Sequence, residues 1–216
     1  MNNSVGNTGR VLWAGLRALL VLTVVCGVLY PLAVTGAAQL AFPGKANGSE
    51  VEDASGRVVG SALIGQTYLS GGEPDLKWFQ PRPSRGLGTN SVNGQYKLVL
   101  SGATNRSGDN QDLITWVTEA KAAVVRDNSV NGWTVKPSDV PADAVTSSGS
   151  GLDPHISPEY ARIQVHRVAA LNKLDVAAVE KLVADHTEGR VLGFMGEPRV
   201  NVLRLNTALK ALVAQG

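Results

Sequence analysis

A short polar segment holds the side chains best suited to chemistry in this 216-residue chain. Ser150, Asp153 and His155 lie close together, and a serine nucleophile, a histidine base and an orienting aspartate are the parts of a hydrolase triad. However, position 148 is Ser where the nucleophile-elbow pattern needs Gly, and triad members normally come from separate loops. The alternative is a network of Ser and Asp turns that fixes a loop and caps a helix at Ser157.

Two glycine-containing segments could cradle an anion with their backbone amides. Ser70, Gly71 and Gly72 belong to a Leu-Ser-Gly-Gly-Glu run that resembles the Leu-Ser-Gly-Gly-Gln signature of transporter ATPases. Ser101 and Gly102 belong to a second run that resembles this signature less closely. We assign these five residues to a nucleotide-linked loop, with an ordinary glycine turn as the simpler alternative. The chain has neither a P-loop nor an Asp-Lys-Thr-Gly phosphorylation loop, so we do not expect it to hydrolyse ATP.

Aromatic and charged side chains mark two further candidate contact sites. Trp78, Phe79 and Arg82 lie in a stiff Pro-containing segment, and such rigid side chains suit a protein interface. The alternative is that the two aromatic residues attach this loop to its own core. Glu197 and Arg199 flank Pro198 and are expected to pair within a turn. Ser150, Asp153 and His155 complete the set of residues that we assign to partner binding.

Composition excludes several classes of function. The single cysteine, Cys26, rules out an intrachain disulfide and leaves a thiolate metal site without a second ligand. Arg10 and Arg17 account for the net charge of +2, and the remaining chain balances its basic and acidic residues, so nucleic-acid binding is disfavoured. We predict no metal site, no catalytic residue and no tightly bound cofactor.

An uncharged apolar run at residues 18–41 predicts a membrane span. Its 24 residues would reach about 36 Å as a helix, which exceeds the roughly 30 Å of a hydrocarbon core. Because Arg10 and Arg17 precede the run, we expect residues 1–17 in the cytoplasm and residues 42–216 outside. A cleavable signal peptide is the alternative, although its apolar region would be shorter. Pro31 predicts a kink.

The elements expected in residues 42–216 form a single α+β domain, because strands and helices follow in mixed order without a regular βαβ repeat. A strand at 57–64 leads into an irregular stretch at 65–94. We predict helices at 110–126, 157–171 and 175–186, capped by Asp109, Ser157 and Asp175. The apolar stripe of the first helix is expected to lie in the core. Strands at 191–195 and 199–203 precede a last helix capped by Asn206 and ending at Val213.

Five segments together resemble motifs of one known family. They are residues 60–66, 78–84, 140–146, 148–158 and 196–203. The resemblance is to the C subunit of the bacterial Kdp potassium-transporting P-type ATPase, and it runs from the membrane span to the end of the chain. The segments at 148–158 and 196–203 are long and specific, which makes chance similarity improbable.

The resemblance implies a non-catalytic subunit of a high-affinity potassium pump in the bacterial cell membrane. It implies three partners: a channel-like potassium-binding subunit, a P-type ATPase subunit and a small membrane peptide. It also implies a role as a catalytic chaperone that raises the ATP affinity of the ATPase subunit, with ATP and potassium handled by the complex. A domain outside the membrane can change ATP affinity only by shifting a conformational equilibrium of its partners. A membrane-anchored extracytoplasmic serine hydrolase is the alternative function.

Overall fold

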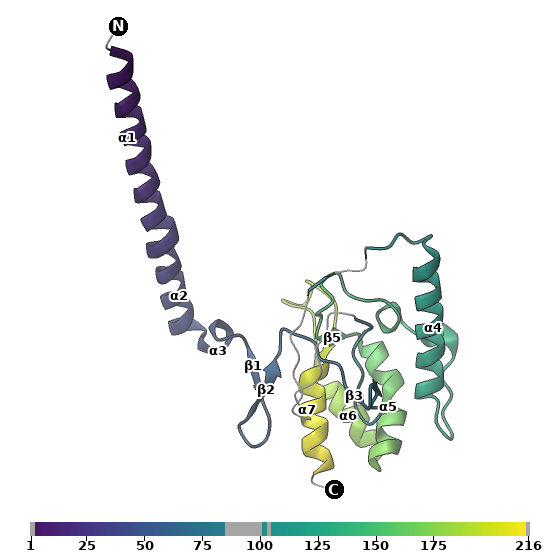
Figure 1. Ribbon diagram of the computed structural model, residues 1–216. Helices are drawn as coiled ribbons and strands as arrows, with labels where there is room; N and C mark the ends of the chain where they lie inside the picture. Colours follow the sequence, from purple (N-terminus) through teal and green to yellow (C-terminus); the bar gives the residue numbers. More distant parts are fainter. Residues whose placement is uncertain (1–2, 85–100, 103–104, 215–216) are drawn as a thin grey trace. The chain divides into compact units, whose positions relative to one another are not determined.

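The structure is a computed structural model that describes residues 3–84, 101–102 and 105–214 (Figure 1). The chain divides into two compact units, Met1–Ser49 and Glu50–Gly216. Residues 85–94 of the predicted irregular stretch lie outside the described residues.

The first unit is a long apolar helix. α1 (Asn3–Val24), the π-helical turn η1 (Val25–Leu29) and α2 (Tyr30–Ala41) follow without a break, and the single turn α3 (Pro43–Ala46) ends the unit. The stretch Gly6–Ala41 is long and apolar enough to cross a membrane, and its most apolar part is exposed within this chain. Residues 3–17, predicted as a tail, are helical as well.

A π-helical turn lies where the sequence predicts a kink. Pro31 is in the first turn of α2, directly after η1. Proline has no N–H for the carbonyl four residues earlier, and its ring would clash with that carbonyl. A wider π turn relieves the clash while the helix continues.

The second unit confirms the predicted α+β class. Its described residues form three small antiparallel sheets: β1 (Glu50–Glu52) with β2 (Val58–Ser61), β3 (Leu69–Ser70) with β4 (Glu73–Pro74), and a three-stranded sheet in the order β5 (His155–Ile156), β7 (Arg199–Asn201) and β6 (Thr187–Glu188). Its helices are α4 (Gln111–Asn128), α5 (Pro158–Asn172), α6 (Val176–Asp185) and α7 (Val202–Val213), with 3-10 turns η2 (Pro137–Asp139) and η3 (Ala142–Ala144).

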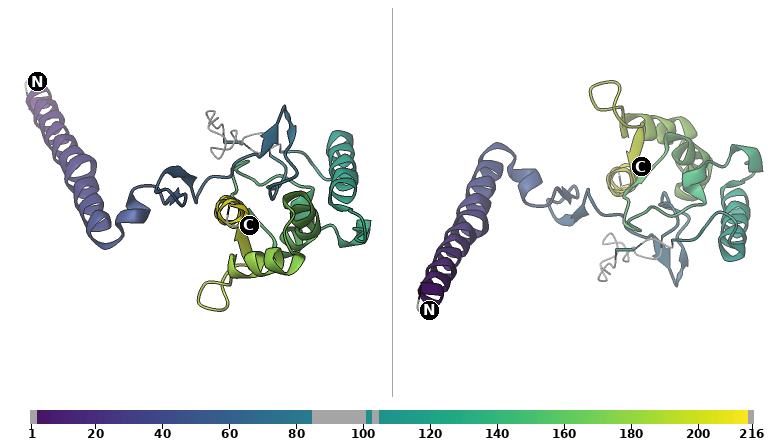
Figure 2. Two further views of the ribbon diagram at one scale, coloured as in Figure 1. Left: turned by 90° about the horizontal axis from the view of Figure 1, so that it is seen from below. Right: turned by 90° about the horizontal axis from the view of Figure 1, so that it is seen from above.

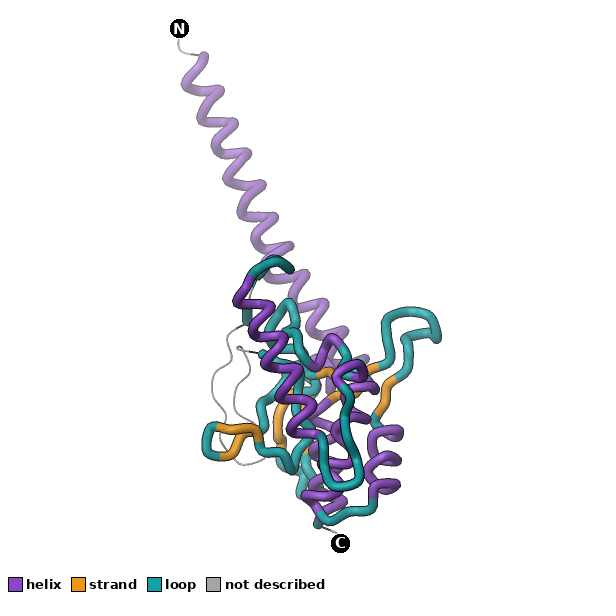
Figure 3. The backbone as a smooth tube through the Cα atoms, turned by 90° about the vertical axis from the view of Figure 1, so that its right-hand side faces the viewer, coloured by secondary structure: helices purple, strands orange, loops and turns teal. Residues whose placement is uncertain are grey.

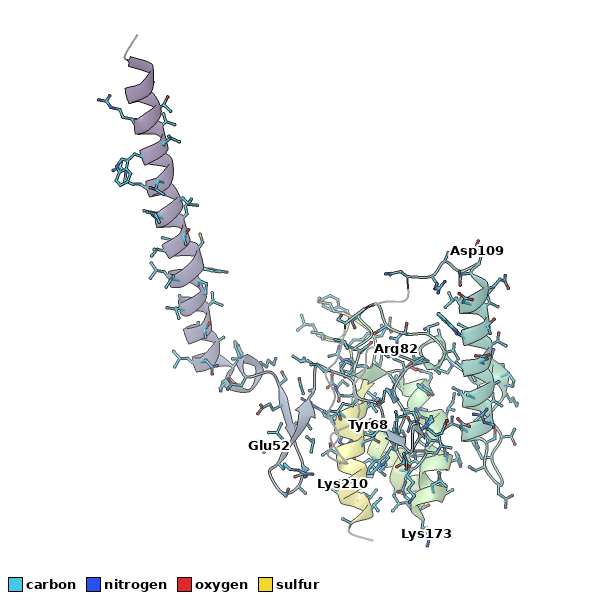
Figure 4. All side chains as sticks on the ribbon, viewed as in Figure 1. Glu52, Tyr68, Arg82, Asp109, Lys173 and Lys210 are labelled. Carbon is cyan, nitrogen blue, oxygen red and sulfur yellow. The ribbon has the colours of Figure 1, made fainter. Side chains whose placement is uncertain are left out.

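Helix α5 forms the centre of the core. Most of its residues are buried, and it packs against α6 and α4 and against strand β7. Figures 1 and 2 show α5, α6 and α7 grouped together, with α4 at the outer edge of this unit. Each fully buried aliphatic or aromatic side chain of such a core contributes about 1.5 to 3 kcal/mol. The fully buried Tyr68 lies among these elements (Figure 4).

The predicted helices 157–171 and 175–186 are confirmed almost to their ends, and the caps at Ser157 and Asp175 are as predicted. The structure corrects the first helix: its cap is Asn110, whose side chain accepts a hydrogen bond from the backbone N–H of Leu113 at 3.2 Å. Asp109 instead accepts a hydrogen bond from Ser107. The apolar stripe of this helix, α4, is only half-buried apart from Val124, because α4 packs at the edge of the core.

The end of the chain also differs from the prediction. Helix α7 begins at Val202 and is capped by Asn201, whereas Asn206 lies buried inside it. The predicted strand at 191–195 is a tight turn closed by Val191 and Met195, and the strand at 199–203 is shortened to β7. Strand β7 pairs with β5 on one side and with β6 on the other. Sequence reasoning missed β6 because its two residues directly follow helix α6.

Candidate functional site

Three segments distant in sequence meet at the loop that leads into β5. Arg82 of the Pro-Arg-Pro segment reaches this loop, with its Nη1 3.1 Å from Asp153 Oδ2. The same guanidinium donates from Nε to the carbonyl of Thr146 at 3.2 Å and from Nη2 to that of Ser147 at 3.4 Å. Ser84 Oγ donates to the carbonyl of Gly151. Figure 4 shows Arg82 on the side of the domain near the start of α4.

Asp153 is the electrostatic centre of this site. Its Oδ1 accepts a hydrogen bond from the backbone N–H of His155 at 2.9 Å and lies 3.3 Å from His155 Nδ1. Partial burial alone would raise the pKa of Asp153, but the two hydrogen bonds from His155 and the charges of His155 and Arg82 outweigh it, so the pKa is lowered. The carboxylate therefore stays ionised at neutral pH and holds Arg82 and His155 in place.

The geometry does not assemble the serine-hydrolase triad. Ser150 Oγ accepts a hydrogen bond from the N–H of Leu152 at 3.1 Å and lies 3.3 Å from Ser148 Oγ. In the described part of the chain, Ser150 has no hydrogen bond to His155, whose Nδ1 faces Asp153. These contacts match the alternative of a Ser and Asp turn network that fixes a loop.

A second close approach brings Ser101 and Gly102 to the same loop. The N–H of Gly102 donates to the carbonyl of Ser150 at 2.9 Å, and Ser101 Oγ donates to that carbonyl at 3.1 Å. Gly151 has a φ of 69°, and a Cβ there would lie 2.7 Å from the carbonyl oxygen of Gly102. Only glycine fits this position, for both conformation and space.

Ser70, Gly71 and Gly72 form an ordinary hairpin turn. Ser70 pairs with Glu73 across β3 and β4, and both glycines have positive φ, at 63° and 94°. This is the primed turn that closes a two-residue hairpin. The glycine-turn alternative therefore accounts for the geometry of this segment, while its assignment to nucleotide binding stays a prediction.

The aromatic segment is attached to the core by buried polar side chains. Asn206 accepts from the N–H of Phe79 and donates to its carbonyl, both at 2.9 Å. Gln164 makes the same pair of bonds to Gln80, at 2.6 and 3.1 Å. Phe79 is fully buried and Trp78 packs against the core, so Phe79 has no exposed surface with which to contact a partner. This matches the alternative that the aromatic residues attach the loop to its own core.

Arg167 completes this attachment and was missed in the sequence. Its guanidinium donates to the carbonyls of Leu76 and Trp78 and to the side-chain oxygens of Gln164 and Asn128. Burial lowers the pKa of Arg167 to about 10, against the opposing effect of nearby Tyr160 and acidic groups. A usable signal was present, because Gln164 and Arg167 are polar residues on the face of α5 that is otherwise apolar.

Glu197 and Arg199 do not pair with each other as expected. Glu197 Oε2 lies 3.0 Å from Arg190 Nη2, and Arg199 Nη2 lies 3.0 Å from Glu188 Oε2. The reason is topological: Arg199 is on β7 opposite Glu188 of β6, whereas Glu197 remains in the connecting loop.

The structure also contains a cavity of about 570 Å³ between residues 133–139, α5 and α6, lined by both apolar and charged side chains. Trp133 and His166 are stacked in its wall, with ring centroids 3.9 Å apart. Neither residue was singled out from the sequence. Among the described residues, no cluster of three His, Cys, Asp or Glu side chains could hold a metal ion.

Comparison with known proteins places the whole chain in one family. Residues 12–211 match the sequence model described as "KdpC: K+-transporting ATPase, c chain". The "Potassium-transporting ATPase KdpC subunit" of Streptomyces avermitilis is 72% identical over 99% of both chains, and that of Streptomyces coelicolor is 66% identical over 100% of this chain and 99% of the relative. The protein of the same name from Mycobacterium tuberculosis is 44% identical over 94% of this chain and 99% of the relative. The chain therefore belongs to the KdpC family, the c chains of K+-transporting ATPases.

Proposed function

We propose that this chain is a non-catalytic accessory subunit of a high-affinity, ATP-driven potassium uptake pump, and that it acts as a catalytic chaperone by raising the ATP affinity of the ATPase subunit. One observation carries the proposal. The family match runs from residue 12 to residue 211, so it includes both the apolar helix and the folded domain. The apolar helix, as the proposed anchor, and the folded domain are thus both within the matched range.

The first unit supports a single-pass anchor with the N-terminus in the cytoplasm. The apolar stretch Gly6–Ala41 needs lipid or partner helices to cover it. The Arg17 guanidinium lies 5.9 Å from the centre of the Trp13 ring, and Trp and Arg are typical anchors at a membrane surface. Arg10 and Arg17 both precede the uncharged run at residues 18–41, so the positive-inside rule directs the domain to the extracytoplasmic side.

This topology restricts the mechanism. A domain outside the membrane does not meet ATP, so its effect on ATP affinity requires different contacts with two conformations of the pump. The proposed partners are the channel-like potassium-binding subunit, the P-type ATPase subunit and the small membrane peptide, which handle potassium and ATP. The exposed parts of Arg82, Asp153, His155 and Ser150 are the proposed contact site on the loop before β5.

Cysteine labelling tests the proposed orientation. In a Cys26→Ala background, Lys181→Cys places a thiol on an exposed position of α6, and Gly9→Cys places one at the start of the anchor. A membrane-impermeant maleimide added to intact cells should label position 181, and position 9 only after the membrane is ruptured. Labelling of position 9 alone on intact cells would show that the orientation is reversed.

A further inference from the structure

The loop between β6 and β7 carries an unusual group of exposed apolar side chains. We call Val191, Leu192, Phe194 and Met195 the apolar tip; their exposed fractions are 53%, 80%, 72% and 52%. Figures 2 and 3 show this loop standing off the domain between the two strands. Single exposed apolar residues need no explanation, but a contiguous group on a protruding loop marks an interaction site.

The apolar tip has a fixed backbone. Val191 and Met195 exchange backbone hydrogen bonds at 2.9 and 3.0 Å, and the N–H of Gly193 donates to the carbonyl of Arg190 at 3.2 Å. Leu192 has a φ of 54°, in the left-handed region that a leucine rarely adopts. The turn thus holds Leu192 in an unfavourable conformation while its side chain is exposed, so burial of that side chain within the domain does not offset the strain.

The charges at the base of the tip neutralise one another. Arg190 pairs with Glu197 at 3.0 Å, and Arg199 pairs with Glu188 at the same distance. A loop that binds an anionic lipid surface combines apolar residues with free cationic groups, and those flanking this tip are already paired. A bilayer is also fluid and gains little from a fixed turn, whereas a shaped crevice binds a preorganised side chain more tightly.

We infer that the apolar tip docks into an apolar crevice on another protein chain of the same pump, with Leu192 and Phe194 as the inserted side chains and the Arg190–Glu197 pair at the polar rim. Central, fully desolvated apolar anchors with a polar rim are the usual form of a protein interface. The inference rests on the proposed function only in that the partner is a subunit of that pump.

Photo-crosslinking identifies the occupant directly. Phe194 is replaced by p-benzoylphenylalanine in the full chain, expressed with its pump subunits, and crosslinked products are identified by mass spectrometry. Position 63 is the matched control, because Leu63 is 63% exposed on the same domain. We expect position 194 to crosslink to a pump subunit at least about tenfold more than position 63. Crosslinking to lipid, equal crosslinking at both positions, or none at position 194 would overturn the inference.

A conservative variant separates docking from folding. Leu192→Asn removes the apolar side chain and introduces a residue that tolerates the left-handed conformation. We expect a melting temperature no lower than that of wild type and at least about a tenfold loss of pump subunits that copurify with the tagged chain in mild detergent. Phe194→Ser provides a second variant outside the strained position.

The outcomes distinguish the two proposals. If the wild-type chain retains no pump subunits, the proposed function fails. If the wild-type chain retains them and both folded variants retain them equally well, the docking inference alone fails.

Discussion

The Arg82–Asp153 pair joins two segments 71 residues apart in the chain. Replacing Asp153 with Asn keeps the shape but leaves a half-buried guanidinium without its counter-charge. We expect the free energy of unfolding at pH 7 to fall by about 1 to 3 kcal/mol. Because the pKa of Asp153 lies below its usual 3.8 in the folded state, the contribution is complete above that value and is lost as the pH falls through the folded pKa.

Chemical unfolding of the full chain in detergent, followed by circular dichroism from pH 7 down to about 3, measures this difference. Asp185→Asn is the control, because Asp185 pairs with Lys181 on the exposed face of α6. An exposed pair contributes less than about 1 kcal/mol. Equal losses in the two variants would contradict a structural role for the Arg82–Asp153 pair.

Helix α5 holds the aromatic segment through side chains that an apolar helix would lack. Gln164→Leu would leave the N–H and carbonyl of Gln80 and one guanidinium nitrogen of Arg167 without their partner. We therefore expect a loss of about 2 to 5 kcal/mol in unfolding free energy. Arg162→Leu, on the exposed side of the same helix, should change it by less than about 0.5 kcal/mol. A Gln164→Leu variant as stable as wild type would show that these buried bonds are dispensable.

The two helix caps should differ in their effect on stability. Ser157 Oγ accepts from the N–H of Tyr160 at 3.0 Å and donates to Asp143 at 2.8 Å, at the start of the central helix. Ser157→Ala should lower the free energy of unfolding by about 1 to 2 kcal/mol. Asn110 caps the outer helix α4, and Asn110→Ala should lower the free energy of unfolding by about 0.5 to 1 kcal/mol. Thermal unfolding of both variants checks this order, and the reverse order would contradict it.

The elements differ in how far the sequence predicts them. Helices α5 and α6 were predicted well because their caps and apolar spacing are local signals. The start of α7 was missed because Asn201 and Asn206 both resemble caps, and only the burial of Asn206 and its hydrogen bond from the backbone of Phe79 show that it is a core residue. In the candidate site, the residue types were identified but not their contacts. The Arg82–Asp153 pair depends on how distant loops meet, which spacing along the chain does not encode.

At the scale of the whole molecule, the chain is a member of the KdpC family over nearly its full length. The chain combines an exposed apolar helix with a domain in which buried polar side chains such as Gln164 and Arg167 hold its own loops. In the proposed function such a chain contributes surfaces to a complex, and the loop before β5 and the apolar tip are the two surfaces that we propose. Its proposed effect on ATP must therefore pass through the conformations of its partners.

The ATP dependence of potassium-stimulated ATPase activity tests this account most directly. The purified pump is compared with the same pump assembled without this chain, and the KM for ATP is measured in each. A coupling of the usual size predicts a KM at least about fivefold higher when the chain is absent. Equal KM values for ATP in the two preparations would contradict the proposed role.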